Sequence, residues 1–246
     1  MSIPKIIHYC WFGGGAISPE NRKCMESWKK YCPDYKIMAW NEQNFDISQN
    51  RYAQQAYEAK RYAFVSDYVR LAVLYEYGGI YLDTDVELVR PLDELLELPG
   101  FMGFQTNNEV ATGLGFGARK GNSVVQALLR DYDALDFLKA DGSADLTPCP
   151  ERNTRVLQAL GVRKDGTRQS IAEMEIFPAE YFCPMDLYSR ELRVTPKTYS
   201  IHRYAESWKP KPSAVSRILQ RLLKKHYYTW YCPLRGRIER RLRKRT

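Results

Sequence analysis

Short apolar runs alternate with longer helical patterns along the first half of the chain. The short runs have the length and composition of buried strands, and they fall at residues 5–9, 35–40, 80–82 and 101–105. Helical patterns lie between them, at residues 18–31 and 54–77. Strands that alternate with helices favour an α/β fold, with a mostly parallel sheet flanked by helices.

Capping signals mark the ends of both helices. Ser18 and Pro19 form a typical helix start, and Pro33 limits the first helix. Residues 54–77 are predicted to form one long helix, because their apolar side chains recur every three or four positions. The glycine pair at residues 78–79 ends this helix and leads directly into the next strand.

The second half of the chain has fewer clear elements. We predict helices at residues 122–136 and 152–160, and a short strand at residues 175–178. Residues 106–117 are rich in glycine and short polar side chains. We therefore expect them to form a loop that lines a pocket.

The positive charge of the chain is concentrated near its end. The net charge of the whole chain is +8, but residues 211–246 carry twelve Lys or Arg against the single acid Glu239. This segment therefore carries +11, and the preceding residues carry −3. Pro210 and Pro212 mark the boundary, so we divide the chain into a domain at residues 1–210 and a basic tail at residues 211–246.

The tail has an amphipathic pattern. Val215, Ile218 and Leu222 belong to one helical stripe in residues 214–231, and the Lys and Arg residues lie largely off it. Such a stripe fits a helix in the interface of an anionic membrane, and equally a helix packed on the domain. The further basic run at residues 235–245 favours the membrane, because a packed helix does not need it.

Composition indicates a folded protein of the cytoplasm. Apolar residues make up 44 % of the chain, which is typical of a packed core. The six cysteines form no CxxC pair and no metal-ligand spacing, so we expect reduced thiols. No secretory signal and no run of about 20 apolar residues is apparent. We expect a cytoplasmic protein that attaches to the inner face of the cell membrane through its tail.

Two carboxylates at the end of a buried strand are the first candidate site. Asp83 and Asp85 follow the apolar run at residues 80–82, and side chains two apart in an extended segment point the same way. Like charges held this close need a cation between them, and oxygen ligands select Mg²⁺ or Mn²⁺. Asp-x-Asp is common by chance, but ligands of open α/β sheets gather at this edge.

Two further groups of polar residues lie in unusual surroundings. Asp67 and Arg70 are three residues apart on one helical face, within a strongly apolar segment. A carboxylate and a guanidinium placed there would suit the hydroxyls of a sugar. His202 lies with Ser207 and Trp208 in a polar and aromatic stretch, where an imidazole and an indole N–H suit a metal-bound diphosphate.

Three segments resemble the family 32 glycosyltransferases. They are IPKIIHYCWFGG at residues 3–14, FVSDYVRLAVLYEYGGIYLDTDVELVRPLDELL at residues 64–96, and IHRYAESW at residues 201–208. The central segment is the most specific, because it joins SDxxR, a double glycine and DxD in a fixed order. Members are DXD-containing sugar transferases of bacterial capsule and surface-polysaccharide clusters, and eukaryotic members act in the Golgi. The resemblance implies a glycosyltransferase A-type, Rossmann-like fold and retention of the anomeric configuration.

The resemblance also implies a role for each candidate residue around the donor sugar. Asp83 and Asp85 would hold Mn²⁺ or Mg²⁺ on the diphosphate of a nucleotide-sugar. Asp67 and Arg70 would bind the donor sugar, and His202 would complete the metal or phosphate site.

The nucleotide would be held by aromatic residues and by the last matching segment. Tyr9 and Trp11 would lie near the base, and Ser207 and Trp208 would contact the β-phosphate. We expect a UDP-hexose rather than a GDP-sugar as the donor, because uridine donors are the commonest among bacterial relatives of this type. The expected acceptor is a saccharide or a lipid-linked saccharide.

Two other functions fit parts of the sequence. Aromatic residues among the tail cations are typical of nucleic-acid binding, but this function would leave the mildly acidic domain and the DxD segment unexplained. Paired Asp residues also serve metal-dependent phosphohydrolases. We rank both below the transferase and expect no nucleic acid as partner.

Overall fold

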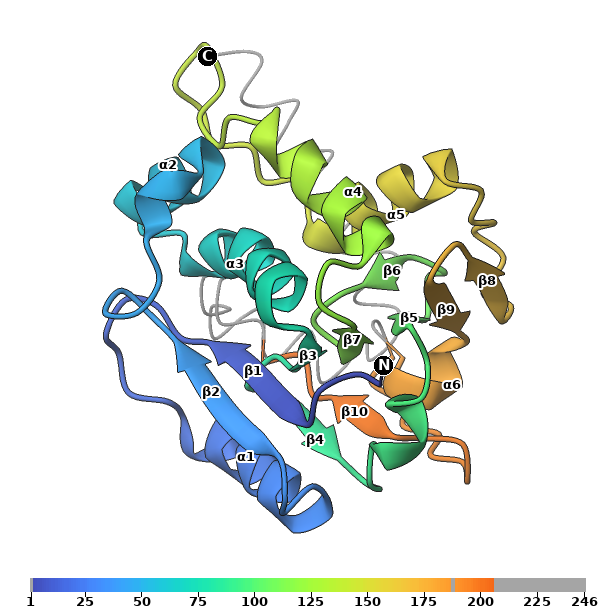
Figure 1. Cartoon of the computed structure of the whole chain (residues 1–246). Helices are drawn as coiled ribbons and strands as arrows, with labels where there is room; N and C mark the ends of the chain where they lie inside the picture. Colours follow the sequence, from blue (N-terminus) through green and yellow to red (C-terminus); the bar gives the residue numbers. More distant parts are fainter. Residues whose placement is uncertain (1, 187–188, 206–246) are drawn as a thin grey trace.

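The main sheet lies between two layers of helices in the computed structural model, which describes residues 2–186 and 189–205 (Figure 1). Its strands are β1 (Ile6–Cys10), β2 (Lys36–Trp40), β3 (Gly79–Tyr81), β5 (Gly100–Phe104), β6 (Val110–Ala111), β7 (Phe116–Ala118), β8 (Gln169–Ile171) and β9 (Met174–Phe177). A second sheet has the strands β4 (Val86–Leu88) and β10 (Ser200–His202). The α-helices are α1 (Pro19–Tyr31), α2 (Arg51–Glu58), α3 (Tyr62–Tyr77), α4 (Ser123–Asp133), α5 (Cys149–Ala159) and α6 (Ala179–Phe182), and short 3₁₀ turns are η1 (Ile47–Gln49) and η2 (Asp93–Leu95).

Most strands of the main sheet point the same way. The strand order is β2-β1-β3-β7-β5-β9-β8, and β6 also pairs with β5. β1 is parallel to β2 and β3, and β5 is parallel to β9. β7 runs antiparallel between β3 and β5. β1, β2, β3, β5 and β9 therefore share one direction, which confirms the predicted α/β fold with a mostly parallel sheet flanked by helices.

Apolar side chains alternate between two cores, one on each face of the sheet. Tyr81 on β3 packs in the core under α2–α5, and its neighbour Ile80 packs in the core on the side of α1. On β5, Met102 belongs to the first core and Phe101 to the second. Because both faces are covered, the central strands appear in the sequence as continuous apolar runs rather than as alternating ones.

The prediction of one helix at residues 54–77 is wrong, because the chain forms α2 and α3 instead. Lys60 adopts a left-handed backbone with φ 55°, and the Arg61 N–H donates to the Ala56 carbonyl at 2.8 Å. These contacts close α2 as a left-handed helix end does. The apolar spacing that carried the prediction begins at Phe64 and lies wholly within α3.

The predicted extension of a strand through Asp83 and Asp85 is also wrong. β3 ends before this pair, and the Asp83 carbonyl accepts from the Val86 N–H at 3.0 Å, so the pair lies in a tight turn. The chain then enters β4, which pairs antiparallel with β10 and places Val86 opposite His202. The sequence pattern did not predict β4 or its pairing.

Other element boundaries differ less. The strands predicted at residues 5–9, 35–40, 80–82, 101–105 and 175–178 are confirmed within one residue at each end. The helix predicted from residue 152 begins at Cys149, and the one predicted to residue 136 ends at Asp133. Residues 106–117 contain β6 and the start of β7 rather than a simple loop.

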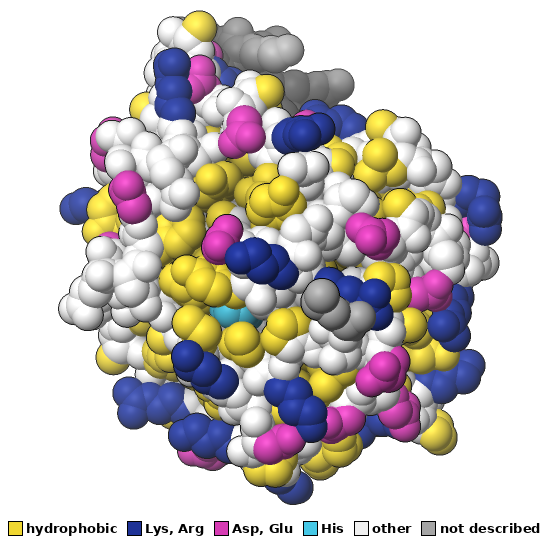
Figure 2. Space-filling model, viewed as in Figure 1, with side chains coloured by type: hydrophobic (Ala, Val, Ile, Leu, Met, Phe, Trp, Pro, Cys, Tyr) yellow, Lys and Arg dark blue, Asp and Glu magenta, His cyan; other side chains and the backbone are white. Residues whose placement is uncertain are grey.

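Ser207, Trp208 and the predicted tail lie outside the described residues. Over the two described ranges, no helix is both long and apolar enough to cross a membrane. The cysteines of these ranges are all buried free thiols, as expected. Basic and acidic side chains intermix on the face shown in Figure 2, around an apolar centre.

Candidate active site

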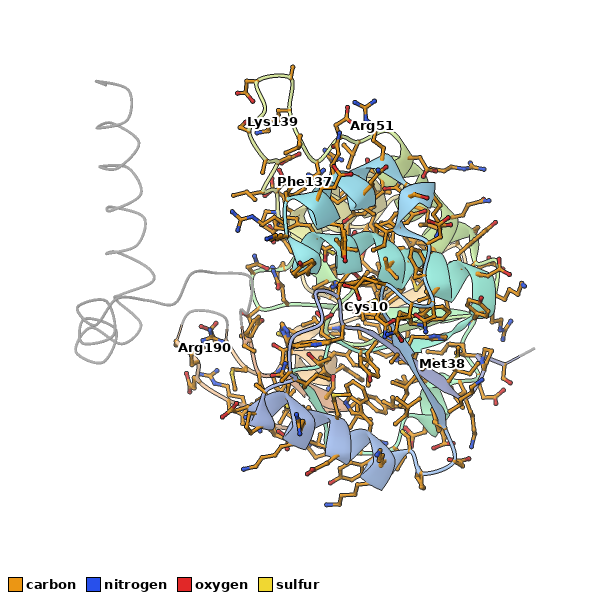
Figure 3. The ribbon with its side chains drawn as sticks, turned by 90° about the vertical axis from the view of Figure 1, so that its left-hand side faces the viewer. Cys10, Met38, Arg51, Phe137, Lys139 and Arg190 are labelled. Atoms are coloured by element: carbon orange, nitrogen blue, oxygen red, sulfur yellow. The ribbon has the colours of Figure 1, made fainter. Side chains whose placement is uncertain are left out.

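The candidate residues meet where β1 and β3 end side by side. The Leu82 N–H donates to the His8 carbonyl at 3.0 Å, which continues the parallel pairing up to the residue before Asp83. Tyr9 and Cys10 continue β1 beside β2, and Trp11 follows the strand at the same edge of the sheet as Asp83. Seen from the side, Cys10 lies where β1 meets the helical layer of α3 (Figure 3). This is the edge at which open α/β sheets bind ligands.

Asp83 is fixed by groups of the main domain. Its Oδ1 accepts from Arg70 Nη2 at 3.1 Å and from the Tyr81 hydroxyl at 3.0 Å. Its backbone N–H donates to the Gly113 carbonyl at 3.2 Å, and a Cβ at Gly113 would collide with the Asp83 carboxylate. Burial raises the pKa of Asp83, while the nearby Arg70 charge opposes the shift.

Asp85 is fixed from the opposite side, by β10 and the residues that follow it. Its Oδ2 accepts from the Ala205 N–H at 2.7 Å, and its Oδ1 lies 3.3 Å from His202 Nε2. Burial would raise the pKa of Asp85, but the imidazole of His202 and the Ala205 N–H outweigh it and lower the pKa to about 2. Burial would lower the pKa of His202, but the Asp85 charge and hydrogen bond raise it.

Asp83, Asp85 and His202 converge, and their role as metal ligands stays a prediction. Their ligand atoms lie within 4.8 Å of one another, although the two carboxylates converge through a turn rather than along a strand. Two carboxylates and an imidazole fit a hard divalent cation such as Mn²⁺. The imidazole must be neutral to bind a metal, so metal binding and protonation would compete at His202.

Asp67 and Arg70 lie beside this group, on α3. Arg70 Nη2 is 3.1 Å from Asp67 Oδ1 and also 3.1 Å from Asp83 Oδ1, so one guanidinium joins the two carboxylates. The side chains of Asp67 and Arg70 are only 12 % and 7 % exposed, as expected from the apolar segment that contains them. Burial raises the pKa of Asp67 to about 6, against the attraction of Arg70.

Sequence reasoning missed three residues of this cluster. Arg70 Nη1 contacts the Thr112 hydroxyl at 3.4 Å and the Cys149 sulfur at 3.8 Å. The Asn153 amide donates to both of these groups at 3.1 Å. Asn153 Oδ1 is buried without a hydrogen-bond partner in the described structure. Thr112 lies in the glycine-rich stretch that we predicted to line a pocket. Cys149 and Asn153 lie on α5 and had no such signal, because tertiary packing alone brings α5 to the site.

The nucleotide side of the site is described in part. Tyr9 is partly buried and its ring lies 5.9 Å from that of Trp28. Trp11 is also partly buried, and its indole N–H donates to the Gly15 carbonyl at 2.5 Å. Both residues stand at the edge of the sheet where the candidate metal ligands lie. Their contact with a base stays a prediction.

Residues 18–101 match the family model described as the glycosyltransferase sugar-binding region containing a DXD motif. The match contains Asp67, Arg70, Asp83 and Asp85, and it stops well before His202. The family model therefore covers the part of the site formed by α3 and by the turn after β3.

Curated relatives carry similar sequences. The chain is 29 % identical over 151 residues to inositol phosphoceramide mannosyltransferase 3 of Schizosaccharomyces pombe, covering 55 % of this chain and 39 % of that protein. It is 25 % identical over 221 residues to an uncharacterized glycosyltransferase of Acanthamoeba polyphaga mimivirus, covering 85 % of this chain and 84 % of that protein. The chain thus spans about two fifths of the yeast protein and most of the viral one.

A solved structure also aligns with the chain. It is a glycosyltransferase involved in the glycosylation of the major capsid of PBCV-1, with 12 % identity and a TM-score of 0.48, covering 82 % of this chain and 95 % of that chain. The comparisons give no support to a nucleic-acid-binding protein or to a phosphohydrolase. Residues 18–101 are thus similar to a glycosyltransferase sugar-binding region, and the chain is similar to the glycosyltransferases named above, which supports sugar transfer.

Proposed function

We propose that this chain is a metal-dependent, retaining hexosyltransferase that moves a sugar from a nucleotide-sugar to a saccharide or lipid-linked acceptor. One observation carries the proposal. The candidate metal ligands Asp83, Asp85 and His202 converge, and Arg70 links Asp83 to the buried Asp67. A nucleotide-sugar has a diphosphate, which a bound metal would hold, and a sugar, whose hydroxyls would donate to a buried carboxylate.

Each group has a part in the proposed transfer. A divalent cation held by Asp83, Asp85 and His202 would stabilise the negative charge of the departing nucleotide diphosphate. Arg70 holds Asp83 in place and also orients Asp67, whose carboxylate accepts hydrogen bonds from hydroxyls of the donor sugar. The acceptor hydroxyl attacks from the face that the diphosphate leaves, which retains the configuration. We name no covalent nucleophile.

The donor and acceptor are proposed from likeness. The family resemblance favours a UDP-hexose over a GDP-sugar, and Mn²⁺ or Mg²⁺ as the metal. The name of the yeast relative states a mannosyl group and an inositol phosphoceramide acceptor, which supports a lipid-linked acceptor and requires GDP-mannose among the donors tested. The family resemblance also favours a place in capsule or surface-polysaccharide synthesis.

The place of action follows from the tail. We propose a cytoplasmic enzyme, with a catalytic domain at residues 1–210 and a basic tail at residues 211–246 that meets the anionic inner face of the cell membrane. The support is the +11 charge of the tail and its apolar stripe.

Donor cleavage by the purified chain tests the function. Four donors, UDP-glucose, UDP-galactose, UDP-N-acetylglucosamine and GDP-mannose, are each incubated with Mn²⁺, Mg²⁺ or EDTA, and the released nucleotide is measured. We expect one donor to be cleaved with metal only. Asp85→Asn is nearly isosteric and should reduce turnover about a hundredfold or more, because metal stabilisation of the leaving group amounts to several kcal/mol.

The control is Asp131→Asn, which removes a carboxylate that pairs with Arg155. It should keep full turnover. Wild-type turnover by Asp85→Asn with Mn²⁺ would contradict the metal assignment. Donor cleavage at a rate that no acceptor changes would favour a hydrolase over a transferase.

A further inference from the structure

The side chain of the residue between the two candidate metal ligands contacts α1. Thr84 is buried, with 8 % exposure, although it lies in a turn between two carboxylates. Its hydroxyl accepts a hydrogen bond from Asn21 Nδ2 at 2.9 Å. The middle of the turn is therefore attached to the layer of α1, while Asp83 is attached to α3 through Arg70.

Asn21 is itself held firmly. It lies in the first turn of α1, and its backbone N–H donates to the capping side chain of Ser18 at 3.1 Å. Asn21 is 5 % exposed, and its side-chain amide donates to Thr84. A buried amide on a capped helix provides a fixed point for the turn.

The same helix holds the strand that follows the turn. The Trp28 indole N–H donates to the Val86 carbonyl at 2.8 Å, and the Ser27 hydroxyl accepts from the Leu88 N–H at 2.8 Å. α1 thus contacts the DxD turn through Asn21, and about two turns later it contacts both ends of β4 through Ser27 and Trp28. Because β4 pairs with β10, α1 also supports the strand that carries His202.

We infer that Asn21 and Thr84 are positioning residues that set the separation of the Asp83 and Asp85 carboxylates for a divalent cation. The inference rests on the proposed function, in which these carboxylates bind the metal. Asp83 is fixed to the main domain and Asp85 to the residues after β10, so the turn between them is the link whose conformation sets their spacing. Losing the Asn21–Thr84 bond frees that link without removing a ligand.

An ordinary structural hydrogen bond would behave differently. Its loss would lower stability and leave metal affinity unchanged. Partners that orient metal ligands have a distinct signature, because their mutation typically weakens metal binding about 10- to 100-fold. The test must therefore measure metal binding directly, together with stability.

Thr84→Val keeps the shape of the side chain and removes the hydroxyl. Binding of Mn²⁺ alone, and of Mn²⁺ with UDP, is measured by electron paramagnetic resonance of the free ion, and thermal unfolding gives Tm. We expect the dissociation constant for Mn²⁺ to rise about tenfold in Thr84→Val and in Asn21→Ala. The double variant should be no worse than either single variant, because both remove the same bond.

Two further variants separate positioning from stability. Thr84→Ser restores the hydroxyl and should restore Mn²⁺ affinity to within about twofold of wild type. Ser27→Ala removes a contact between α1 and β4 that lies farther along the helix. We expect it to lower Tm by a few degrees, as we also expect for Thr84→Val, and to leave Mn²⁺ affinity unchanged.

The outcomes distinguish the inference from the function that it depends on. If the wild type binds Mn²⁺ and cleaves its donor, but Thr84→Val binds Mn²⁺ equally well, the positioning role is refuted and the transferase stands. A parallel loss of affinity in Ser27→Ala would refute it as well, since general loosening of α1 would then suffice. If the wild type neither binds Mn²⁺ nor cleaves any donor, the proposed function fails and the inference falls with it.

Discussion

Asp83 and Asp85 show how surroundings separate two identical side chains. Burial raises the pKa of Asp83, and the positive charge of Arg70 on α3 stabilises its ionised carboxylate. Asp85 faces His202 and the Ala205 N–H, which lower its pKa to about 2 in spite of burial. One carboxylate is thus supported by the Arg70 guanidinium, and the other by the His202 imidazole and the Ala205 N–H.

Asp67 should distinguish the sugar from the nucleotide. Arg70 Nη2 joins it to Asp83, but it is not one of the candidate metal ligands, so we assign it to sugar hydroxyls rather than to the diphosphate. We expect Asp67→Ala to weaken binding of the nucleotide-sugar about tenfold or more, since a buried charged hydrogen bond contributes about 1.5–3 kcal/mol. Titration calorimetry with Mn²⁺ should show almost unchanged affinity for the bare nucleotide.

The matched control for this measurement is again Asp131→Asn, which should change neither affinity. An equal loss of affinity for the nucleotide-sugar and for the bare nucleotide in Asp67→Ala would indicate that Asp67 only supports the fold. A loss of affinity for the bare nucleotide alone would contradict the proposed arrangement of the site.

At the scale of elements, the buried His8 side chain connects two strands to the end of a helix. His8 on β1 contacts the Gly78 carbonyl at 2.9 Å through Nε2, and its Nδ1 accepts from the Trp40 indole of β2 at 3.0 Å. An indole N–H can only donate, so Nδ1 carries no proton and Nε2 carries it. His8 is therefore neutral, and it connects β1 and β2 to the end of α3.

This arrangement predicts a pH-dependent stability. Burial lowers the pKa of His8 to about 4, with a smaller contribution from the nearby Lys36 charge. Between about pH 6.5 and pH 4 the unfolded chain takes up a proton that the folded chain refuses, so this contribution to stability is complete above pH 6.5 and decreases as the pH falls. The total loss is on the order of 3 kcal/mol.

Urea unfolding followed by tryptophan fluorescence, from pH 4 to pH 7, measures this loss. His8→Gln cannot titrate and should be less stable at pH 7, with a flatter slope between pH 6.5 and pH 4. The same slope in both proteins would show that other groups cause the pH dependence. His202 is unchanged in this comparison, and its raised pKa acts in the opposite sense.

At the scale of the whole molecule, charge separates the described domain from the tail. Residues 1–210 carry a net charge of −3, whereas residues 211–246 carry +11. Basic and acidic side chains are intermixed on the face in Figure 2. Electrostatic attraction to a membrane should therefore depend on the tail. The tail itself lies outside the described residues.

Flotation with vesicles tests this attraction. Full-length protein should float with vesicles that contain about a third anionic lipid and remain behind with neutral ones, because each cation near an anionic surface contributes about 1 kcal/mol. Replacing five tail arginines with Gln should abolish flotation; the set is Arg237, Arg240, Arg241, Arg243 and Arg245.

A control protein carries the same charge change on exposed cations of the domain, and it should float normally; its set is Lys23, Lys29, Lys30, Lys139 and Arg193. Equal flotation of the two substituted proteins, or no effect of anionic lipid, would refute the membrane role. The tail would then be better described as a helix packed on the domain.

The sequence alone determined the local features of this protein. Buried strands appear as apolar runs, because both faces of the sheet are covered. Ser18 and Gly78 mark helix ends, because capping depends on the properties of single residues. The candidate site residues Asp67, Arg70 and Asp83 were visible because charges inside apolar segments are costly without a purpose.

Tertiary structure decided what depends on distant contacts. The turn at Asp83 and Asp85 exists because β4 pairs with β10, more than a hundred residues away, and no local pattern encodes that pairing. Cys149 reaches Arg70, and Asn153 reaches Thr112, only because α5 packs against β6 and α4. Local sequence limits backbone conformation and burial, whereas the distances between side chains that make a site are set by how the layers pack.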